Sequence, residues 1–361
     1  MTHTITTPAW LNITFGTGIK HVEIIRVAKN LSAMLSAGLS LARALSIIER
    51  QSNNKYLKKV IVGISESIKR GSSFHEALAL SPKVFPALFV AMVRAGEESG
   101  SLTESLSVVA LQMERSEELR RKIKSAMIYP AIVMVAIIIV GVLMLIYVVP
   151  TLTDTFKSLG VDLPRSTQII IALSDFMVAH VFSTFALLVA FFMSIIYFAK
   201  SNIGSRLIVA VSLHIPVIGD MVRETYTARC ARTLSSLLSA SVPVLEALAI
   251  TKDVVRTPSF AHVIGEAEVR VRKGETLSSS FSEHQNLYPI LMSDMLAVGE
   301  ETGNVSGMLK QIAEFYEADV AEKTKDFSTV IEPLLMLFIG AFVGIFAVSM
   351  IAPIYSLSSA I

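Results

Sequence analysis

The sequence is poor in cysteine, charge and targeting signals. Cys230 is the one cysteine among 361 residues, which excludes an intrachain disulfide framework. Charged side chains make up 17% of the chain, below the roughly 25% of an average soluble protein. The net charge of +2 gives no bulk attraction to nucleic acid, so we expect no nucleic-acid partner. Residues 1–18 lack the basic and apolar regions of a cleavable signal, and we expect none.

Apolar residues are abundant instead, and they gather in three long runs. Hydrophobic residues form 52% of the chain, with a mean hydropathy of +0.60. The runs cover 131–149, 176–199 and 334–352, and each approaches the roughly 20 residues of helix that cross a bilayer. The first and third runs are uncharged, whereas the second carries His180 near its start. The sequence therefore predicts a polytopic membrane protein with three transmembrane helices.

Basic residues near the spans predict the orientation, because Lys and Arg are retained on the cytoplasmic side. Before the first span lie Arg115, Arg120, Arg121, Lys122 and Lys124. The loop between the first two spans has only Lys157 and Arg165, and the end of the chain after the third span is uncharged. We expect a cytoplasmic N-terminus and a C-terminus that lies outside the cytoplasm.

These observations divide the chain into eight parts. We expect an N-terminal segment (1–20), a first cytoplasmic helical domain (21–125), a first span (126–150), a short periplasmic loop (151–172), a second span (173–199), a second cytoplasmic helical domain (200–330), a third span (331–353) and a short periplasmic tail (354–361).

The two helical domains are copies of one another. Between residues 26 and 353, many residue types recur 203 positions later without a slip in register, as Arg26 and Arg229 or Pro86 and Pro289 do. Each repeat is a domain of about a hundred residues followed by a span. The second span has no counterpart, and it is needed to return the second domain to the same side of the membrane.

Apolar spacing within each domain is helical. Val27, Leu31 and Met34 recur at three or four residues, which is typical of an amphipathic helix, and Gly38 follows as a helix-ending glycine. Further helices are expected over 55–69, 73–80, 86–95 and 102–124. The fold class is all-α, with two homologous bundles of about six helices each. In the second copy Ser241 stands in place of Gly38, which weakens that helix-end signal.

The most motif-like element is a repeated Gly-Glu-Glu-x-Gly turn. It contains Glu97 and Glu98 in the first copy and Glu300 and Glu301 in the second. One interpretation is a tight turn between helices whose glycines meet backbone needs and whose carboxylates face water. The other is a docking or cation-binding role for these four carboxylates, which would be the sole metal candidates.

Charge differs between the copies. Residues 1–125 hold 17 basic and 10 acidic side chains, a net +7, whereas residues 200–330 hold 13 and 16, a net −3. The first domain carries a basic cluster that consists of Lys55, Lys58, Lys59, Lys69 and Arg70. This cluster is a candidate docking surface for an acidic partner or acidic lipid, and the alternative is a solvated basic face near the membrane.

Matched residues also mark the start of the first and third spans. Tyr129 and Pro130 correspond to Glu332 and Pro333. A carboxylate at a membrane interface either anchors the span or contacts a basic partner segment, so both roles stay open for Glu332. A proline inside a helix removes a backbone hydrogen bond, and the pair is either a mobile joint or a static bend.

Several motifs together resemble the type II secretion F-domain family. They include Phe85-Pro86-Ala87-Leu88-Phe89, the Gly-Glu-Glu-Ser-Gly turn, Lys124-Ser125-Ala126-Met127-Ile128-Tyr129-Pro130, Val148-Val149-Pro150, Ser158-Leu159-Gly160 and Ile331-Glu332-Pro333-Leu334. The resemblance runs from about residue 21 to the end of the chain. Members are inner-membrane platform proteins of type IV pilus and type II secretion machines.

The resemblance implies a non-enzymatic platform with no cofactor. Its implied partners are a cytoplasmic hexameric assembly ATPase, prepilins or pseudopilins, other inner-membrane platform proteins, the lipid bilayer and further copies of the chain as a homo-oligomer. The sequence lacks a phosphate-binding loop, since the run that starts at Lys273 has no upstream glycine at the required spacing.

Two other classes of function are weighed against the platform. An oligomeric transporter or channel component would need ionisable residues or interrupted helices at mid-membrane, yet the first and third spans are uncharged. A membrane hydrolase would need a nucleophile near a base, and no such catalytic motif occurs in the sequence. We expect no catalytic residues.

Overall fold

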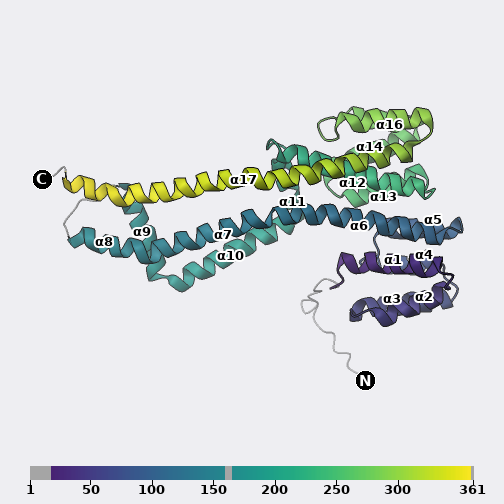
Figure 1. Ribbon diagram of the computed structural model, residues 1–361, viewed down its shortest axis with the longest axis horizontal. Helices are drawn as coiled ribbons and strands as arrows, with labels where there is room; N and C mark the ends of the chain where they lie inside the picture. The colour runs from purple at the N-terminus through teal and green to yellow at the C-terminus, as the bar shows by residue number, and fades with distance from the viewer. Residues whose placement is uncertain (1–17, 159–164, 359–361) are drawn as a thin grey trace, which may run out of the picture. The chain divides into compact units, whose positions relative to one another are not determined.

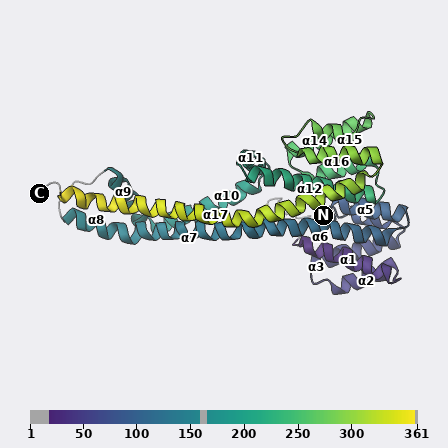
Figure 2. The same ribbon diagram turned by 45° about the horizontal axis from the view of Figure 1, so that its top comes forward.

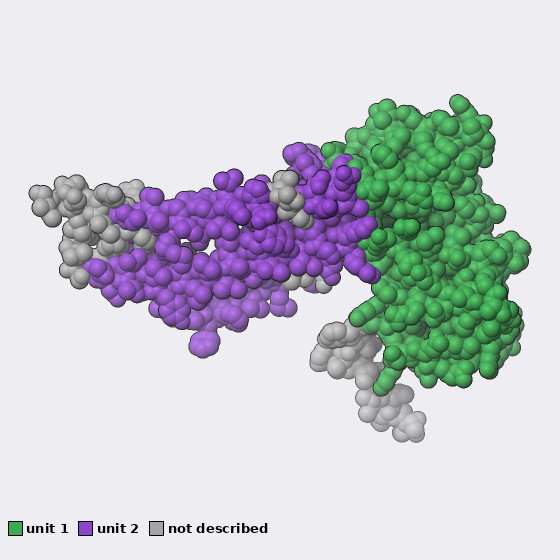
Figure 3. Space-filling model, in the orientation of Figure 1, with its two compact units in different colours: residues 1–120, 220–320 green, residues 121–219, 321–361 purple. Residues whose placement is uncertain are grey.

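Every regular element in the described part of the chain is a helix. The computed structural model describes residues 18–158 and 165–358. Residues 1–17, 159–164 and 359–361 lie outside the described residues. They belong to the expected N-terminal segment, the loop after the first span and the tail. The chain divides into two compact units (Figure 3), unit 1 with residues 1–120 and 220–320 and unit 2 with residues 121–219 and 321–361.

Repeat 1 is a bundle of short amphipathic helices that ends in a long one (Figure 1). The helices are α1 (His21–Ser36), α2 (Leu41–Gln51), α3 (Lys55–Lys69), α4 (Phe74–Ala79), α5 (Ala87–Glu98) and α6 (Leu102–Ala126). The helices expected over 55–69, 73–80, 86–95 and 102–124 are confirmed to within three residues at each end.

Repeat 2 has the same helices in the same order. They are α12 (Ile218–Ser239), α13 (Val244–Val255), α14 (Pro258–Arg272), α15 (Leu277–Ser282), α16 (Ile290–Thr302) and α17 (Val305–Ser358). Helices α13 to α17 each begin 203 residues after their counterparts α2 to α6. The duplication that the sequence predicts is therefore a duplication of structure, and two homologous helical bundles are confirmed.

The core of each repeat is apolar and fully enclosed. In repeat 1, Phe85 and Phe89 are buried with their ring centroids 5.1 Å apart. In repeat 2, Tyr288 lies between Phe260 and Phe281 with edge-to-face geometry, and its hydroxyl donates a hydrogen bond of 3.2 Å to the Phe260 carbonyl. Cys230 belongs to this core, where burial raises the pKa of its thiol to about 12. The lone cysteine is thus a packing residue that stays protonated at neutral pH.

The turn between the first two helices keeps one backbone conformation in both repeats. Gly38 has φ +81°, the left-handed region that favours glycine. Ser241, its counterpart, has φ +62°. The missing glycine of the second copy therefore does not change the turn, and Ser241 bears the steric cost of the conformation.

Unit 2 contains the apolar helices. They are α7 (Ile128–Leu143), the π-helical turn η2 (Met144–Val148), α8 (Val149–Ser158), α9 (Arg165–Ala179), α10 (Val181–Lys200), α11 (Asn202–Ser212) and the part of α17 from residue 321. Among the described residues, the helical runs Leu102–Thr155 and Val305–Ser349 are long and apolar enough to cross a membrane. They contain the whole of the first expected span and the third as far as Ser349.

The second expected span is not one straight helix. The segments Thr167–Ala179 and Val181–Ser194 meet at an angle of 100°. His180 lies between them with φ −130° and ψ 46°, so the helical backbone stops there and restarts at the next residue. The described chain therefore has two continuous candidate spans, or three if this bent pair crosses as one. No residue pattern predicts the bend, because His180 is neither proline nor glycine.

Candidate functional site

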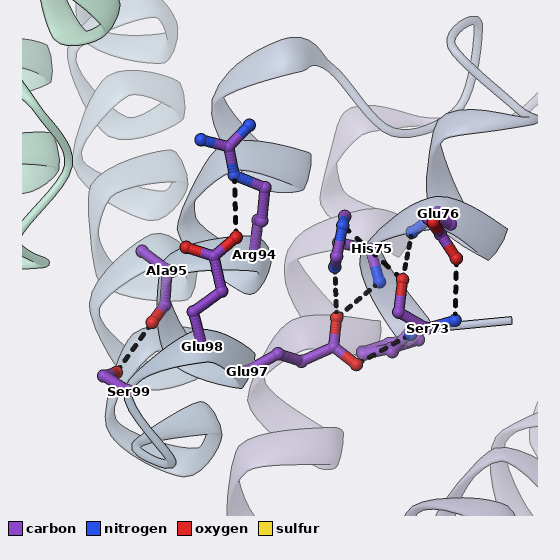
Figure 4. Close-up of polar contacts among 9 residues, drawn as sticks. Ser73, His75, Glu76, Arg94, Ala95, Glu97, Glu98 and Ser99 are labelled. Carbon is purple, nitrogen blue, oxygen red and sulfur yellow. Dashed lines mark hydrogen bonds and ion pairs between the residues drawn. The ribbon is translucent and has the colours of Figure 1, made fainter.

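The Gly-Glu-Glu-x-Gly turn of repeat 1 holds the start of α4 (Figure 4). The Glu97 carboxylate accepts hydrogen bonds from the backbone N–H groups of Phe74 and His75, each at 2.7 Å, and lies 2.6 Å from His75 Nδ1. Ser73, the residue before α4, forms a capping box with Glu76. Glu97 is therefore a helix cap that comes from another helix, α5, and its negative charge suits the positive end of the α4 dipole.

Repeat 2 reproduces this arrangement. The Glu300 carboxylate accepts hydrogen bonds from the Leu277 N–H at 2.5 Å and the Ser278 N–H at 3.1 Å. The Ser278 hydroxyl donates a further one at 2.6 Å. Leu277 and Ser278 are the counterparts of Phe74 and His75, so the first glutamate of the turn has the same partners in both copies. Nothing in the local pattern of the turn predicts this contact, because the capped helix lies more than 20 residues upstream.

The glycines of the turn allow two helices to approach closely. A Cβ on Gly96 would lie 3.0 Å from the Leu102 Cα, and one on Gly299 would lie 3.0 Å from the Val305 Cα. Gly100 and Gly303 take φ +72° and +71°, which reverses the chain between the helices. The turn therefore needs glycine at both places for backbone reasons, as the tight-turn interpretation expects.

The second glutamates have a different environment. Glu98 is exposed and lies 3.4 Å from Arg94 Nε, and Glu301 is also exposed (Figure 4 shows the Glu98 pair). Within residues 18–158 and 165–358, no group of three His, Cys, Asp or Glu residues is arranged to hold a metal ion. Glu98 and Glu301 are thus accessible to a partner, whereas Glu97 and Glu300 cap the neighbouring helices α4 and α15.

The first and last helices of each repeat are also tied by matched contacts. Lys29 contacts Glu114 at 2.6 Å, and their counterparts Arg232 and Glu317 form a two-bond pair at 2.9 and 2.7 Å. The hydroxyls of Ser32 and Ser235 donate to the carbonyls of Thr103 and Ser306 at 3.0 and 2.8 Å. Each repeat is therefore built on the same polar framework.

The two repeats contact each other inside unit 1, a feature that sequence reasoning missed. Arg94 on α5 donates to Glu246 on α13 at 2.7 Å. Gln112 on α6 contacts the hydroxyls of Thr233 and Ser236 on α12 at 3.4 and 3.3 Å. Figures 1 and 2 both show α6 beside α12. Gln112, Thr233 and Ser236 are buried in this contact, and their burial can be recognised only in the folded structure.

The basic cluster of the first domain lies on one helix and its end. Lys55, Lys58, Lys59, Lys69 and Arg70 are all exposed, on α3 and the residue that follows it. Lys58 has a weak contact of 3.9 Å with Glu49. In repeat 2 the counterparts of Lys55, Lys58 and Lys59 are Pro258, Ala261 and His262, so most of the cluster exists in one copy only.

The candidates at the spans differ in their helical context. Pro130 lies in the first turn of α7. One non-helical residue, Met127, separates α7 from α6. Pro333 lies inside α17, where the helix continues without interruption. Tyr129 and Glu332 are both exposed in the chain. The helical hydrogen-bonding pattern is therefore interrupted for one residue near the proline in one copy and is continuous in the other.

Polar contacts also occur within unit 2. The Ser174 hydroxyl donates to the Leu145 carbonyl at 2.5 Å, in the π-helical turn η2, and the Thr167 hydroxyl donates to the Ser349 carbonyl at 2.6 Å. A π-helical turn leaves backbone carbonyls without their usual partners, and Ser174 supplies one. Helix α9 is thereby joined to η2 and to α17.

A duplicated helical module followed each time by an apolar span defines a class of two-domain membrane proteins. The family model described as type II secretion system (T2SS), protein F, matches residues 27–150 and again residues 230–353. The chain belongs to this family, the inner-membrane platform proteins of type IV pilus and type II secretion systems. Its members are non-enzymatic, as the resemblance implied.

Relatives of both kinds of machine cover almost the whole chain. The type IV pilus assembly protein PilC of Thermus thermophilus is 36% identical over 95% of this chain and 84% of its own length. PilC of Myxococcus xanthus is 34% identical over 95% of this chain and 82% of its own. The type II secretion system protein F of Pseudomonas aeruginosa is 30% identical over 96% and 85%.

Proposed function

We propose that the chain is the platform on which a cytoplasmic hexameric ATPase drives prepilin or pseudopilin subunits from the bilayer into a filament. The observation that carries this proposal is the duplicated domain, which matches the secretion protein F family in both copies and precedes an apolar span each time. Relatives named for pilus assembly and for type II secretion are similar to it over most of its length, so the proposal covers both machines.

Deletion of the gene tests this function. We expect loss of surface filaments in electron micrographs, or loss of secreted protein, with the assembly ATPase still present in the cell. Restoration by the intact gene is the control. Wild-type filaments and secretion in the deletion strain, or solute flux through vesicles that contain the purified chain, would contradict the platform and favour a transporter.

The proposed topology places both repeats, 21–125 and 200–330, in the cytoplasm and the end of the chain in the periplasm. It is supported by the excess of Lys and Arg before the first span and by the few basic residues between the first two. Reporter fusions at Ser52, which follows α2, and at Ser259, in the first turn of α14, should report the same compartment, and a fusion after residue 361 the other one. Opposite signals from Ser52 and Ser259 would overturn the topology.

The proposed ATPase contact is the basic cluster on α3. Its support is that all five side chains are exposed and that repeat 2 lacks three of them. The double variant Lys58→Glu, Lys59→Glu should reduce ATPase pull-down about tenfold and abolish filaments. Its matched control is Arg272→Glu, Lys273→Glu, which makes the same change of charge at the counterparts of Lys69 and Arg70.

The two outcomes of that experiment separate protein docking from lipid binding. Unchanged pull-down and assembly would leave the cluster as a solvated face. Unchanged pull-down with weaker binding to anionic vesicles would assign it to lipid.

The proposed prepilin contact is Glu332. Its carboxylate is exposed where α17 becomes apolar, and a positively charged segment of an incoming subunit would complement it. Glu332→Gln should abolish filaments while the protein still accumulates in the membrane. Tyr129→Phe at the matched position is the control, and normal filaments with Glu332→Gln would leave an anchoring role alone.

A further inference from the structure

The contact between the repeats joins two different faces. Repeat 1 uses α5 and α6, through Arg94 and Gln112, whereas repeat 2 uses α12 and α13, through Thr233 and Glu246. Such a contact is heterologous, because the two partners do not use equivalent surfaces. It leaves one face of each kind unused, the α1–α2 face of repeat 1 and the α16–α17 face of repeat 2.

The open face of repeat 2 consists of Asp294, Val298, Gln311 and Phe315, which occupy the positions of Ala91, Ala95, Val108 and Gln112. Repeat 2 covers Gln112, which is only 5% exposed, whereas Phe315 at the matched position is 54% exposed. Asp294 is likewise exposed where Ala91 is buried. An aromatic ring and an apolar neighbour, Val298, therefore face outward at the place where repeat 1 holds its partner.

The open face of repeat 1 consists of Asn30, Ala33, Ala37 and Arg43, which occupy the positions of Thr233, Ser236, Ala240 and Glu246. Thr233 and Ser236 are buried against repeat 1, whereas Ala33 is exposed and Asn30 is half-buried. On both faces, the residues of the open repeat are therefore more exposed than their counterparts in the contact between the repeats. Figures 1 and 2 show α16 and α2 on opposite sides of unit 1.

We propose that the open face of repeat 2 binds the open face of repeat 1 in a second copy of this chain, by repeating the contact that joins the repeats within one chain. Size is complementary, because Phe315 would meet Asn30 and the small Ala33, as Gln112 meets Thr233 and Ser236. The proposal deepens the homo-oligomer part of the proposed function and does not depend on the ATPase or prepilin contacts.

Charge is complementary as well. Within the chain the pair is Arg94 with Glu246. Between copies Arg43 takes the place of Glu246 and Ala297 takes the place of Arg94, and the acidic residues one turn to either side of Ala297 on α16 are Asp294 and Glu301. Arg43 would therefore meet carboxylates beside the matched position. The basic balance of residues 1–125 and the acidic balance of residues 200–330 also favour association of a first domain with a second one.

Cross-linking of two differently tagged full-length copies in membranes tests the contact. One copy carries Ala33→Cys and the other Phe315→Cys, and the native Cys230 is fully buried and does not compete. A short bis-maleimide should give a dimer that carries both tags. The negative control pairs Ala33→Cys with Val269→Cys, because Val269 on α14 is 53% exposed, like Phe315, but lies outside the open face.

An intrachain pair shows that the reaction works and that unit 1 is folded. Arg94→Cys with Glu246→Cys replaces an accessible ion pair of 2.7 Å, and mass spectrometry should find the joined peptides. If this control is cross-linked while the pairs 33/315 and 33/269 give equal yields, the proposal is wrong. A dimer formed only between two Phe315→Cys copies would show a two-fold contact and would also overturn it.

A charged substitution gives an independent measurement. Phe315→Arg places a charged side chain against Asn30 and Ala33 and should lower co-purification of the two tagged copies about tenfold, with Val269→Arg unchanged. Equal effects of the two variants, with the intrachain 94/246 cross-link intact in both, would contradict the contact. ATPase pull-down measured on the same samples separates this failure from failure of the proposed platform function.

Discussion

Repeat 1 and repeat 2 share their polar framework but differ in their cores. The glutamate cap of the fourth helix, the ion pair between the first and last helices and the serine bond beside it occur at matched positions in both. In contrast, the aromatic positions Phe260 and Phe281 of repeat 2 are Leu57 and Leu78 in repeat 1. Apolar cores tolerate such exchanges when volume is kept, whereas a cap needs one particular group in one place.

The outward faces diverge more than the cores. Lys58 and Lys59 of repeat 1 are matched by Ala261 and His262, and Gln112 is matched by Phe315. The two copies therefore keep the residues that hold each bundle together and differ in the residues that each bundle presents to its surroundings. The following experiments use each repeat as the internal reference for the other, and amide hydrogen exchange is suitable because it reads local opening helix by helix.

The largest effect should follow from loss of the caps. Glu300→Ala removes three hydrogen bonds at the start of α15, and Glu97→Ala removes the matched set at α4. Because charged acceptors are lost and buried N–H groups are left without partners, the free energy of local opening should fall by about 2–3 kcal/mol in the affected helix. Exchange of the peptides 74–79 and 277–282 measures it.

Glu98→Ala and Glu301→Ala are the controls for the caps. Both side chains are exposed, so each substitution should change local opening by less than about 0.5 kcal/mol. An equal effect of the first and second glutamates would show that the turn, and not the cap, fixes the short helix.

An intermediate effect should come from the matched ion pairs, whose loss should lower the local free energy of opening by different amounts. Arg232 and Glu317 are 13% and 17% exposed and bond through two atoms each, whereas Lys29 and Glu114 are 50% and 44% exposed and share one contact. Arg232→Ala should therefore cost about 1–2 kcal/mol at the contact of α12 with α17, and Lys29→Ala less than about 0.5 kcal/mol in repeat 1. Equal losses would mean that burial does not distinguish the pairs.

Many of the helices and the duplication could be predicted from the sequence, by apolar periodicity and by the constant offset between repeated residues. The helix from Lys55 to Lys69 and the 203-residue register are visible because apolar spacing and repeated residues are local or arithmetic signals. The bond from Glu97 to Phe74 and the contact of Arg94 with Glu246 are not visible, because they join helices that are distant in sequence and follow no period. The bend at His180 escaped for another reason, since that residue type does not interrupt a helix by itself.

A smaller effect should come from the turn that glycine occupies in only one repeat. Ser241 has φ +62°, and Gly38 has φ +81° without strain. Ser241→Gly should stabilise the α12–α13 turn by about 1 kcal/mol, and Gly38→Ser should destabilise the α1–α2 turn by a similar amount. Exchange at the first turn of α13 and α2 measures the two signs. A gain or loss in the same direction for both would contradict strain as the cause.

The smallest effect should be a pH dependence that only repeat 1 shows. Partial desolvation lowers the pKa of His21, with an opposing contribution from the Glu117 carboxylate and a further lowering from Arg120. The unfolded chain therefore takes up this proton first as pH falls below about 6.5, so α1 should lose stability between pH 7 and pH 5.5. Repeat 2 has Glu224 at the matched position, and α12 should show no such loss in this range. His21→Gln should abolish the dependence in α1, and its persistence in that variant would assign the proton to another group.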